Sequence, residues 1–142
     1  MTRTDDVDAG VLAQIHQLYG WQSHLIDGGS AREWAETFTP DGEFNSPSYP
    51  EAVIGTADLQ SFAERFYANA AAANEVHRHV VTNLVVDVLG EDTLRVQAYL
   101  QIVATTRGGE SRLVRFTTLD DTVVRAESGW KIARRNVFRD DS

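Results

Sequence analysis

Four long strand-like runs fill the second half of the chain and constrain its fold more than any other feature of the sequence. Each run is rich in Val, Leu, Ile, Thr and aromatic residues, and each gap between runs contains glycine beside polar or acidic residues. Short gaps of this composition favour hairpins, so the runs are expected to pair as antiparallel neighbours. They are much longer than the usual strand of about 5–6 residues, so the sheet must curl. The expected strands are Val76–Leu89, Thr93–Thr106, Ser111–Arg125 and Trp130–Phe138.

Three helices are expected before these strands. The first carries apolar residues at helical spacing, starts from Asp8 as its N-cap and ends at Asp27, because Gly28-Gly29 follows. Ser30 stands three residues before Glu33, which is the sequence of a capping box and predicts a second helix. A third apolar stripe predicts another helix, with Thr56 as its N-cap. The expected helices cover Asp8–Asp27, Ser30–Phe38 and Ala57–Ala73.

The segment between the second and third helices is expected to be irregular. It contains a predicted turn at Thr39–Gly42 and two short strands, Glu43–Ser46 and Val53–Gly55. Helices followed by long antiparallel strands predict an α+β fold with the helices on one face of the sheet. A curved antiparallel or mixed sheet wrapped around three N-terminal helices forms a cone with an internal pocket. We expect one domain that spans residues 1–142.

The composition excludes several classes of binding partner and location. The formal net charge of -8 argues against nucleic acid, because phosphate binding needs clustered Lys and Arg. No apolar run approaches the roughly 20 residues of a membrane helix, and the first residues have no apolar core typical of a secretion signal. The chain has 0 cysteines, which excludes disulfides and thiolate metal sites. We therefore expect a cytoplasmic protein that acts on a small molecule without a cofactor.

The run His77–Leu84 places polar side chains inside an otherwise apolar strand. Alternate residues of a strand share a face, so His77, His79, Val81 and Asn83 are expected on one side unless a bulge intervenes. A buried polar group needs a partner. Asp27 is the candidate partner of His79, because an acid in the last turn of a helix opposes the macrodipole and ordinary stability would not select it.

Each of these residues has a simpler interpretation. His79 could be a strand histidine that is hydrogen-bonded to a loop, and Asp27 could serve only the turn before Gly28-Gly29. The His77-Arg78-His79 sequence could bind a metal if a third ligand such as Asp27 joined it. Since no other His or Cys clusters with them in the sequence, we expect no metal site.

Four motifs together resemble one known superfamily. They are Leu18-Tyr19 with Asp27 eight positions after the tyrosine, Phe38–Gly42 after the second helix, His79–Leu84 in the first long strand, and Gly129–Ile132 in the last strand. With these motifs the chain resembles the SnoaL-like branch of the nuclear transport factor 2 (cystatin-like cone) superfamily. The resemblance spans nearly the whole chain and implies the same cone-shaped α+β fold.

The spacing from Tyr19 to Asp27 and the His-x-x-Thr-Asn-Leu sequence resemble the hexachlorocyclohexane dehydrochlorinases and, more loosely, the scytalone dehydratases. In those enzymes an Asp at the end of the first helix orients a His of the third strand, which removes a proton. The resemblance implies these roles for Asp27 and His79. A pocket arginine of the last strand falls on Arg135, although Arg134 is the other residue that could face inward.

The rest of the implied pocket is apolar. The second histidine and the tyrosines of the scytalone dehydratases have no match, because Gln97 and Tyr99 occupy that region. Small-molecule sites are usually lined by aromatic side chains with a few polar groups. Besides Arg135, the expected substrate-binding residues are Tyr19, Asn83, Trp34, Phe44, Tyr49, Phe62, Phe66 and Tyr99.

The leading functional hypothesis is an acid/base enzyme that acts on a hydrophobic small molecule. An unperturbed histidine titrates near ~6.5, which suits a general base. A carboxylate on one ring nitrogen would stabilise the imidazolium. The resemblance favours a polyketide-type cyclase, a dehydratase or other lyase, or an isomerase, working as a homodimer or homotrimer that pairs through the open face of the sheet.

Two other classes remain open. One is a non-catalytic assembly subunit, similar to the β-subunits of ring-hydroxylating dioxygenases, in which Arg112, Arg115 and Arg125 form salt-bridged contacts on the open face of the sheet. The other is an epoxide hydrolase, which would need a second inward acid near Arg135 or Arg95. Asp87 and Asp120 are the available acids for that role.

Overall fold

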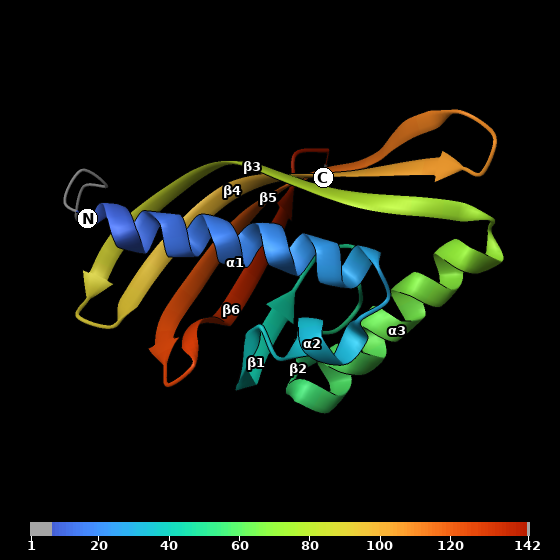
Figure 1. Cartoon of the computed structure of the whole chain (residues 1–142). Coiled ribbons are helices and arrows are strands. Elements are labelled where there is room, and N and C mark those ends of the chain that lie inside the picture. The colour runs from blue at the N-terminus through green and yellow to red at the C-terminus, as the bar shows by residue number, and fades with distance from the viewer. Residues whose placement is uncertain (1–6, 142) are drawn as a thin grey trace.

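The computed structural model describes residues 7–141 and contains three helices in that range. Helix α1 (Ala9–Asp27) precedes a short α2 (Ala31–Ala35), and α3 (Thr56–Ala72) follows after two strands (Figure 1). None of these helices is long and apolar enough to cross a membrane. The strands are β1 (Phe38–Asn45), β2 (Val53–Ile54), β3 (Glu75–Gly90), β4 (Thr93–Thr106), β5 (Ser111–Ala126) and β6 (Gly129–Arg139).

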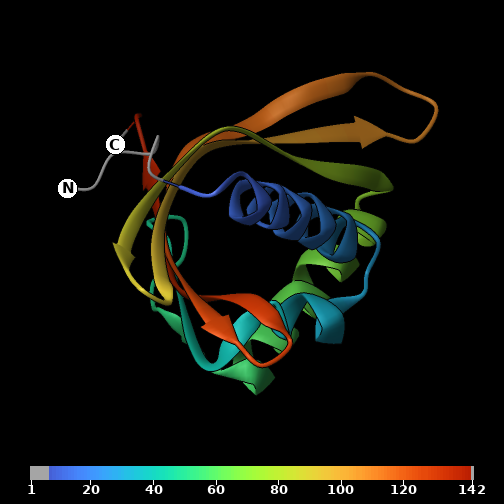
Figure 2. The ribbon, with the colours of Figure 1, turned by 60° about the vertical axis from the view of Figure 1, so that its left-hand side comes forward.

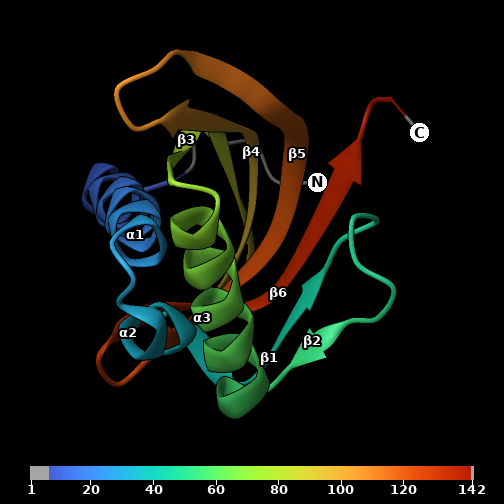
Figure 3. The ribbon, with the colours of Figure 1, turned by 90° about the vertical axis from the view of Figure 1, so that its right-hand side faces the viewer.

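The strands form one six-stranded sheet in the order β2-β1-β6-β5-β4-β3. All neighbouring pairs are antiparallel except β1 and β6, which are parallel, so the sheet is mixed. The long strands curl around α1, which lies in the concave side of the sheet (Figure 2). Helix α3 lies beside β1 and β2 and, with α2, covers the end of the cone (Figure 3). The predicted α+β cone with a curved, mixed sheet is confirmed.

Helix α1 turns one face into the cone. Its buried residues are Ile15, Tyr19, Gln22, Leu25 and Ile26, the spacing of a single helical face. The predicted N-cap is confirmed, because the Asp8 carboxylate accepts hydrogen bonds from the backbone N–H groups of Gly10 and Val11. The helix ends at Asp27, as predicted from Gly28-Gly29.

The other two helix starts differ from the prediction. Ser30 makes no side-chain capping hydrogen bond, and Gly55, rather than Thr56, is the N-cap of α3. Helix α2 ends at Ala35 because Phe38 already belongs to β1, where it is buried and pairs with Ile132 of β6. The sequence predicted that the helix continues to Phe38. Burying the Phe38 ring in the sheet stabilises the chain more than extending the helix would.

The predicted turn at Thr39–Gly42 lies inside β1. The register of β1 with β6 jumps from Phe38↔Ile132 to Glu43↔Arg134, so the turn-forming residues make a bulge instead of ending the strand. A side chain at Gly42 would lie 2.8 Å from Cβ of Phe38, which explains why glycine is needed at this bend.

Two further bulges change which residues face the inside of the cone. In β3 the register with β4 shifts between Thr82 and Val85, where Asn83 has a positive φ of 59°. In β5 the register with β4 shifts between Leu113 and Arg115, leaving Val114 as the extra residue. A bulge adds one residue to one strand and so reverses the in/out alternation beyond it.

Candidate active site

Asp27 and His79 lie in direct contact, as predicted. The Oδ1 atom of Asp27 is 2.6 Å from Nδ1 of the His79 ring, and its Oδ2 atom accepts a hydrogen bond of 2.8 Å from the backbone N–H of His79. Only 6% of the Asp27 side chain and 13% of the His79 side chain are exposed. A carboxylate can only accept, so Nδ1 carries a proton and the neutral ring keeps its lone pair on Nε2.

The end of α1 fixes the position of Asp27. The backbone N–H of Ser30 donates to the carbonyl of Leu25 at 2.9 Å, and Gly29, with a φ of +83°, supplies the left-handed residue that this helix ending requires. The helix therefore stops with Asp27 in its last turn, facing β3. Two hydrogen bonds from His79 compensate the unfavourable placement of an acid at the negative end of the helix.

The His79 ring reaches a cavity between the sheet and the helices. The cavity encloses about 50 Å³, and a second hollow of about 410 Å³ adjoins it. Both spaces share Tyr49, Phe62, Phe66 and Arg115 in their walls. The ring of Phe66 lies 5.1 Å from the His79 ring, and this contact holds the imidazole against its strand.

Aromatic rings form one wall of the cavity. Trp34 and Phe62 stack at 5.8 Å, Phe44 lies 5.0 Å from Phe62, and Tyr49 meets Phe62 edge-on at 5.0 Å. Small-molecule sites are usually lined by apolar and aromatic side chains of this kind. Trp34, Phe44, Tyr49, Phe62 and Phe66 thus lie where the sequence predicted them.

A buried ion pair forms the floor of the cavity. Arg135 donates from Nη2 to Oδ2 of Asp121 at 2.9 Å, and from Nε to both oxygens of this carboxylate. The Tyr19 hydroxyl donates to the same carboxylate at 2.5 Å. No described residue accepts a hydrogen bond from Nη1 of Arg135, and the arginine lines the cavity.

The environment shifts two pKa values at this floor. Burial, reinforced by the negative charge of Asp121, raises the pKa of Tyr19 well above its ordinary value. Burial works against the charge of Arg135, but the Asp121 carboxylate outweighs it, and the pKa of the guanidinium is raised. Arg135 is therefore a permanent cation and Tyr19 a neutral donor at physiological pH.

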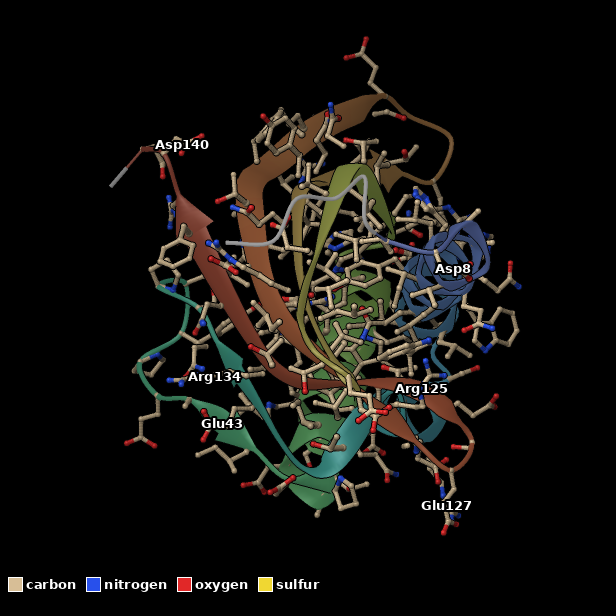
Figure 4. The ribbon with its side chains drawn as sticks, turned by 90° about the vertical axis from the view of Figure 1, so that its left-hand side faces the viewer. Asp8, Glu43, Arg125, Glu127, Arg134 and Asp140 are labelled. Carbon is tan, nitrogen blue, oxygen red and sulfur yellow. The ribbon has the colours of Figure 1, made fainter. Side chains whose placement is uncertain are left out.

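The structure settles which of the two neighbouring arginines faces inward. Arg135 is buried, with 6% of its surface exposed. Arg134 points away from the cavity, on the outside of the cone (Figure 4). Its Nε atom lies 3.4 Å from Oε2 of Glu43 of β1. The predicted choice of Arg135 is correct.

Three predicted binding residues do not line the cavity. Tyr19 lies behind Arg135, bound to Asp121. Asn83 is exposed. It lies in the β3 bulge with a positive φ, so the regular alternation of side chains that would have placed it inside is interrupted at this residue. Tyr99 is 46% exposed and contacts Phe116 on the outer face of the sheet. The prediction that Tyr19, Asn83 and Tyr99 line the cavity is wrong for all three.

Other cavity residues were missed. Asp121 is fully buried beside Arg135, and Arg115 and Thr117 lie on the same inner row of β5. Strand alternation carries the signal: Leu119, Asp121 and Val123 share one face, so a charged residue stands in an apolar row. Gln22, Ser46 and Ser48 also line the cavity, and no motif marked them.

Neither acid considered for epoxide hydrolysis lies beside Arg135: Asp87 is buried on β3 opposite Arg95 of β4, and Asp120 is also a partner of Arg95. Asp120 faces outward and pairs with Arg95 at 2.7 Å, while Asp121 is the acid on Arg135. No second described carboxylate forms an ion pair with Arg135. An acid–arginine–acid set around Arg135 is therefore not formed by residues 7–141.

His77 lies near His79 but has a different partner. Its Nε2 atom is 3.0 Å from Oε1 of Glu75, and its ring contacts Phe66. Within residues 7–141, no three His, Asp or Glu side chains come close enough together to hold a metal ion.

Several known proteins are similar to this chain. A family profile described as a SnoaL-like domain matches residues 11–136. ActVI-ORFA from Streptomyces coelicolor has a TM-score of 0.86 at 22% identity, with 95% of this chain and 98% of that chain covered. An NTF2-like protein with a cystatin-like fold from Novosphingobium aromaticivorans has a TM-score of 0.81 at 21% identity, with 92% and 82% covered.

A third similar structure is a complex. A Catenulispora acidiphila protein in complex with S-DNPA has a TM-score of 0.82 at 26% identity, with 94% of this chain and 96% of that chain covered. No curated protein matches the sequence. The structural likenesses agree on the cystatin-like cone, and the histidine, the arginine and the aromatic wall described above lie inside that cone.

Proposed function

We propose that this chain, which belongs to the SnoaL-like domain family, is an acid/base enzyme that works without a cofactor on a hydrophobic small molecule. One observation carries the proposal: the Asp27 carboxylate holds both the backbone and the ring of His79, and the ring lines an aromatic cavity. This is the arrangement that a general base needs, because its free nitrogen is fixed in direction and kept from bulk water.

In the proposed reaction, Nε2 of His79 removes a proton from a carbon next to a carbonyl group. The electron pair of the broken C–H bond moves onto the carbonyl oxygen and forms an enolate. Asp27 stabilises the resulting imidazolium. The free N–H groups on Nη1 of Arg135 donate to the enolate oxygen, in a site where few water molecules compete.

The fate of the enolate defines the reaction class. Return of the proton to another carbon gives isomerisation. Proton transfer to a hydroxyl group on the adjacent carbon, with cleavage of its C–O bond, releases water. Attack of the carbon on an internal electrophile closes a ring. We favour cyclisation or dehydration in polyketide-type metabolism, since the similar proteins include ActVI-ORFA and a protein that binds S-DNPA.

The base can be tested without the natural substrate. In 5-nitrobenzisoxazole, removal of the C3 proton breaks the N–O bond and releases a coloured phenolate, with no other reactant. We expect the wild type to accelerate this elimination and His79→Gln to lose roughly 10²–10⁴ of the acceleration. His24→Gln, an exposed histidine on α1, is the matched control and should keep the wild-type rate. Equal rates for wild type and His79→Gln would overturn the proposal.

A second candidate, an assembly or binding subunit, is supported by the outer face of the sheet. Tyr99, Phe116 and Phe138 are 46%, 46% and 53% exposed on neighbouring strands. Exposed apolar groups that gather in this way usually mark an interface. The same face would serve a homodimer or homotrimer if the chain is an enzyme.

The arginines that were predicted to form the outer interface have other partners. Arg112 pairs with Glu75, Arg125 pairs with Asp92 at 3.1 Å, and Arg115 faces the cavity. Native mass spectrometry separates the two candidates. A homo-oligomer that dissociates in Tyr99→Lys/Phe116→Lys agrees with the enzyme. A monomer that binds only a larger, different chain favours the assembly subunit.

A further inference from the structure

Arg115 is the exception among the arginines of β4, β5 and β6. The other arginines of these strands each have a carboxylate partner: Arg95, Arg112, Arg125, Arg134, Arg135 and Arg139. No described carboxylate lies within ion-pair distance of Arg115. Its hydrogen-bond partner is the hydroxyl of Tyr49, 3.0 Å from Nη1. A half-buried cation without a counter-charge is unfavourable unless another group supplies the charge.

Arg115 lies on the inner row of β5, in regular alternation with Thr117 and Leu119. Arg115 pairs with Ile102 of β4, and Ile102 pairs with His79 of β3, so the three residues form one row across the sheet. Adjacent strands lie about 4.8 Å apart, which puts the backbones of His79 and Arg115 roughly 10 Å apart. Both residues line the same cavity. One ligand with a flat body can therefore reach both side chains.

Tyr49 holds the arginine in place. Its hydroxyl accepts from Nη1, and its ring lies 5.5 Å from the centre of the guanidinium. The Nε and Nη2 groups of Arg115 have no hydrogen-bond acceptor in the described part of the chain. The neighbouring Ser48 Oγ is buried without a hydrogen-bond partner and lies in the same wall. These donors are arranged for an acceptor that the protein itself does not supply.

The nearest acid of the outer hollow cannot neutralise Arg115. Glu75 is bound by His77 at 3.0 Å and by Arg112 at 2.5 Å. The hydrogen bonds from His77 and Arg112 lower the pKa of Glu75, so its charge is already compensated. The whole chain carries a net charge of -8, so the positive charge of Arg115 does not reflect a generally basic surface. It is confined to this hollow.

We infer that Arg115 binds a carboxylate of the substrate, so that the substrate is a flat, aromatic carboxylic acid. The inference rests on the proposed function of His79 and adds the substrate class. One guanidinium with a hydroxyl beside it matches the single charge of a carboxylate, whereas a phosphate dianion calls for more cations. The acid group lies at the junction of the cavity and the outer hollow, and the ring system extends along the aromatic wall to His79.

Binding of two matched probes tests this inference. The probes are 2-naphthylacetic acid and its neutral analogue 2-naphthylacetamide, titrated by calorimetry against the wild type, Arg115→Gln and Arg134→Gln. We expect the wild type to bind the acid at least tenfold more tightly than the amide. Arg115→Gln should bind both equally, and Arg134→Gln, which changes an arginine on the outside of the cone, should keep the preference. Equal binding of the probes by the wild type, or a preference that survives in Arg115→Gln, overturns the inference.

A second variant covers the case in which Arg115→Gln does not fold. Tyr49→Phe removes only the hydroxyl that holds the guanidinium and should reduce the preference for the acid severalfold; an unchanged preference contradicts the inference. Failure of the proposed function looks different. His79→Gln would then leave the elimination rate unchanged while the preference for the acid still depends on Arg115.

Discussion

The Asp27 carboxylate binds His79 twice, through the backbone N–H at 2.8 Å and through Nδ1 of the ring at 2.6 Å. A single bond to the ring would leave the imidazole free to pivot about it. The second bond ties the same carboxylate to the strand, so helix α1 and strand β3 together define the direction of the ring. The position of Nε2 therefore depends on both elements.

Replacing Asp27 by Asn should remove the base without removing the histidine. The amide oxygen can still accept from the backbone N–H of His79, which places the NH₂ group against Nδ1. That nitrogen then becomes the acceptor and the proton moves to Nε2, so the lone pair no longer faces the cavity. We expect elimination of 5-nitrobenzisoxazole to fall by roughly 10²–10⁴, as for the loss of a positioned base.

Nitrogen NMR of the His79 ring provides the control for this variant. The wild type should show a protonated Nδ1 and Asp27→Asn a protonated Nε2, with the thermal unfolding of both proteins cooperative. A variant with the exchanged tautomer and the full rate would show that His79 is not the base.

The sequence was sufficient to predict the three helices and the four long strands, but not the start of β1 at Phe38. The contact between Asp27 and His79 was predicted as well. Alternation and hairpin turns are local signals, and so is the Gly28-Gly29 helix end. The contact needed two further arguments. A buried histidine and an acid opposed to the macrodipole each lack a local partner, and the resemblance to enzymes with an Asp–His pair implies that these two residues meet.

Two assignments of strand faces could not be predicted. Alternation assigned Asn83 to the inside, but the bulge at this residue, which no glycine marks, moves it to the surface. Arg115 was expected on the outer face, but it lies on the inner row of β5 with Thr117. The inward orientation of Asp121 was missed although alternation carries it, because Asp121 shares its face with the apolar Leu119 and Val123.

Loss of Asp121 should destabilise the protein strongly. Its carboxylate is the counter-charge of Arg135, whose side chain is 7% exposed. Removing one partner of a buried ion pair leaves the other charge unpaired, with a penalty of about 3–5 kcal/mol. We expect Asp121→Asn to lose this much free energy of unfolding in urea denaturation at neutral pH.

The double variant Asp121→Leu/Arg135→Met is the matched comparison for that measurement. It removes both charges and keeps apolar volume, so it should lose much less stability than Asp121→Asn, even though the two changes lie in the same site. A double variant as unstable as Asp121→Asn would mean that the lost packing, rather than the unpaired charge, causes the effect.

Tyr19 should make the protein sensitive to alkali. Its pKa is raised by burial and by the charge of Asp121, so the folded state holds the phenolic proton more tightly than the unfolded chain does. The stabilisation from Tyr19 is complete below the unfolded pKa of about 10 and is lost as the pH rises toward the folded pKa. Tyr19→Phe should be less stable than the wild type at pH 8.

That difference should narrow above pH 10, since only the wild type must keep a buried tyrosine neutral there. Urea midpoints measured at intervals between pH 8 and pH 11 give the comparison. A difference that stays constant over this range would show that Tyr19 ionises equally readily in the folded and unfolded states.

Gly20 inside α1 and Gly29 just beyond the end of this helix should respond in opposite directions to alanine. Gly29 has a φ of +83°, and an added Cβ would lie 3.1 Å from the Tyr67 ring. Tyr67 is 44% exposed and can move, so the main penalty is the left-handed backbone, about 1–2 kcal/mol. Gly20 lies inside α1 with open space around it, and alanine there should stabilise by about 0.5–1 kcal/mol.

The same pair separates stability from positioning of the base. Because Gly29 fixes where α1 ends, Gly29→Ala should displace Asp27 and slow the elimination reaction, whereas Gly20→Ala should not. In Gly20→Ala/Gly29→Ala the two stability changes should largely cancel while the slower rate remains. Recovery of the rate in the double variant would mean that Gly29 acts only through global stability, and that the helix end does not position Asp27 against His79.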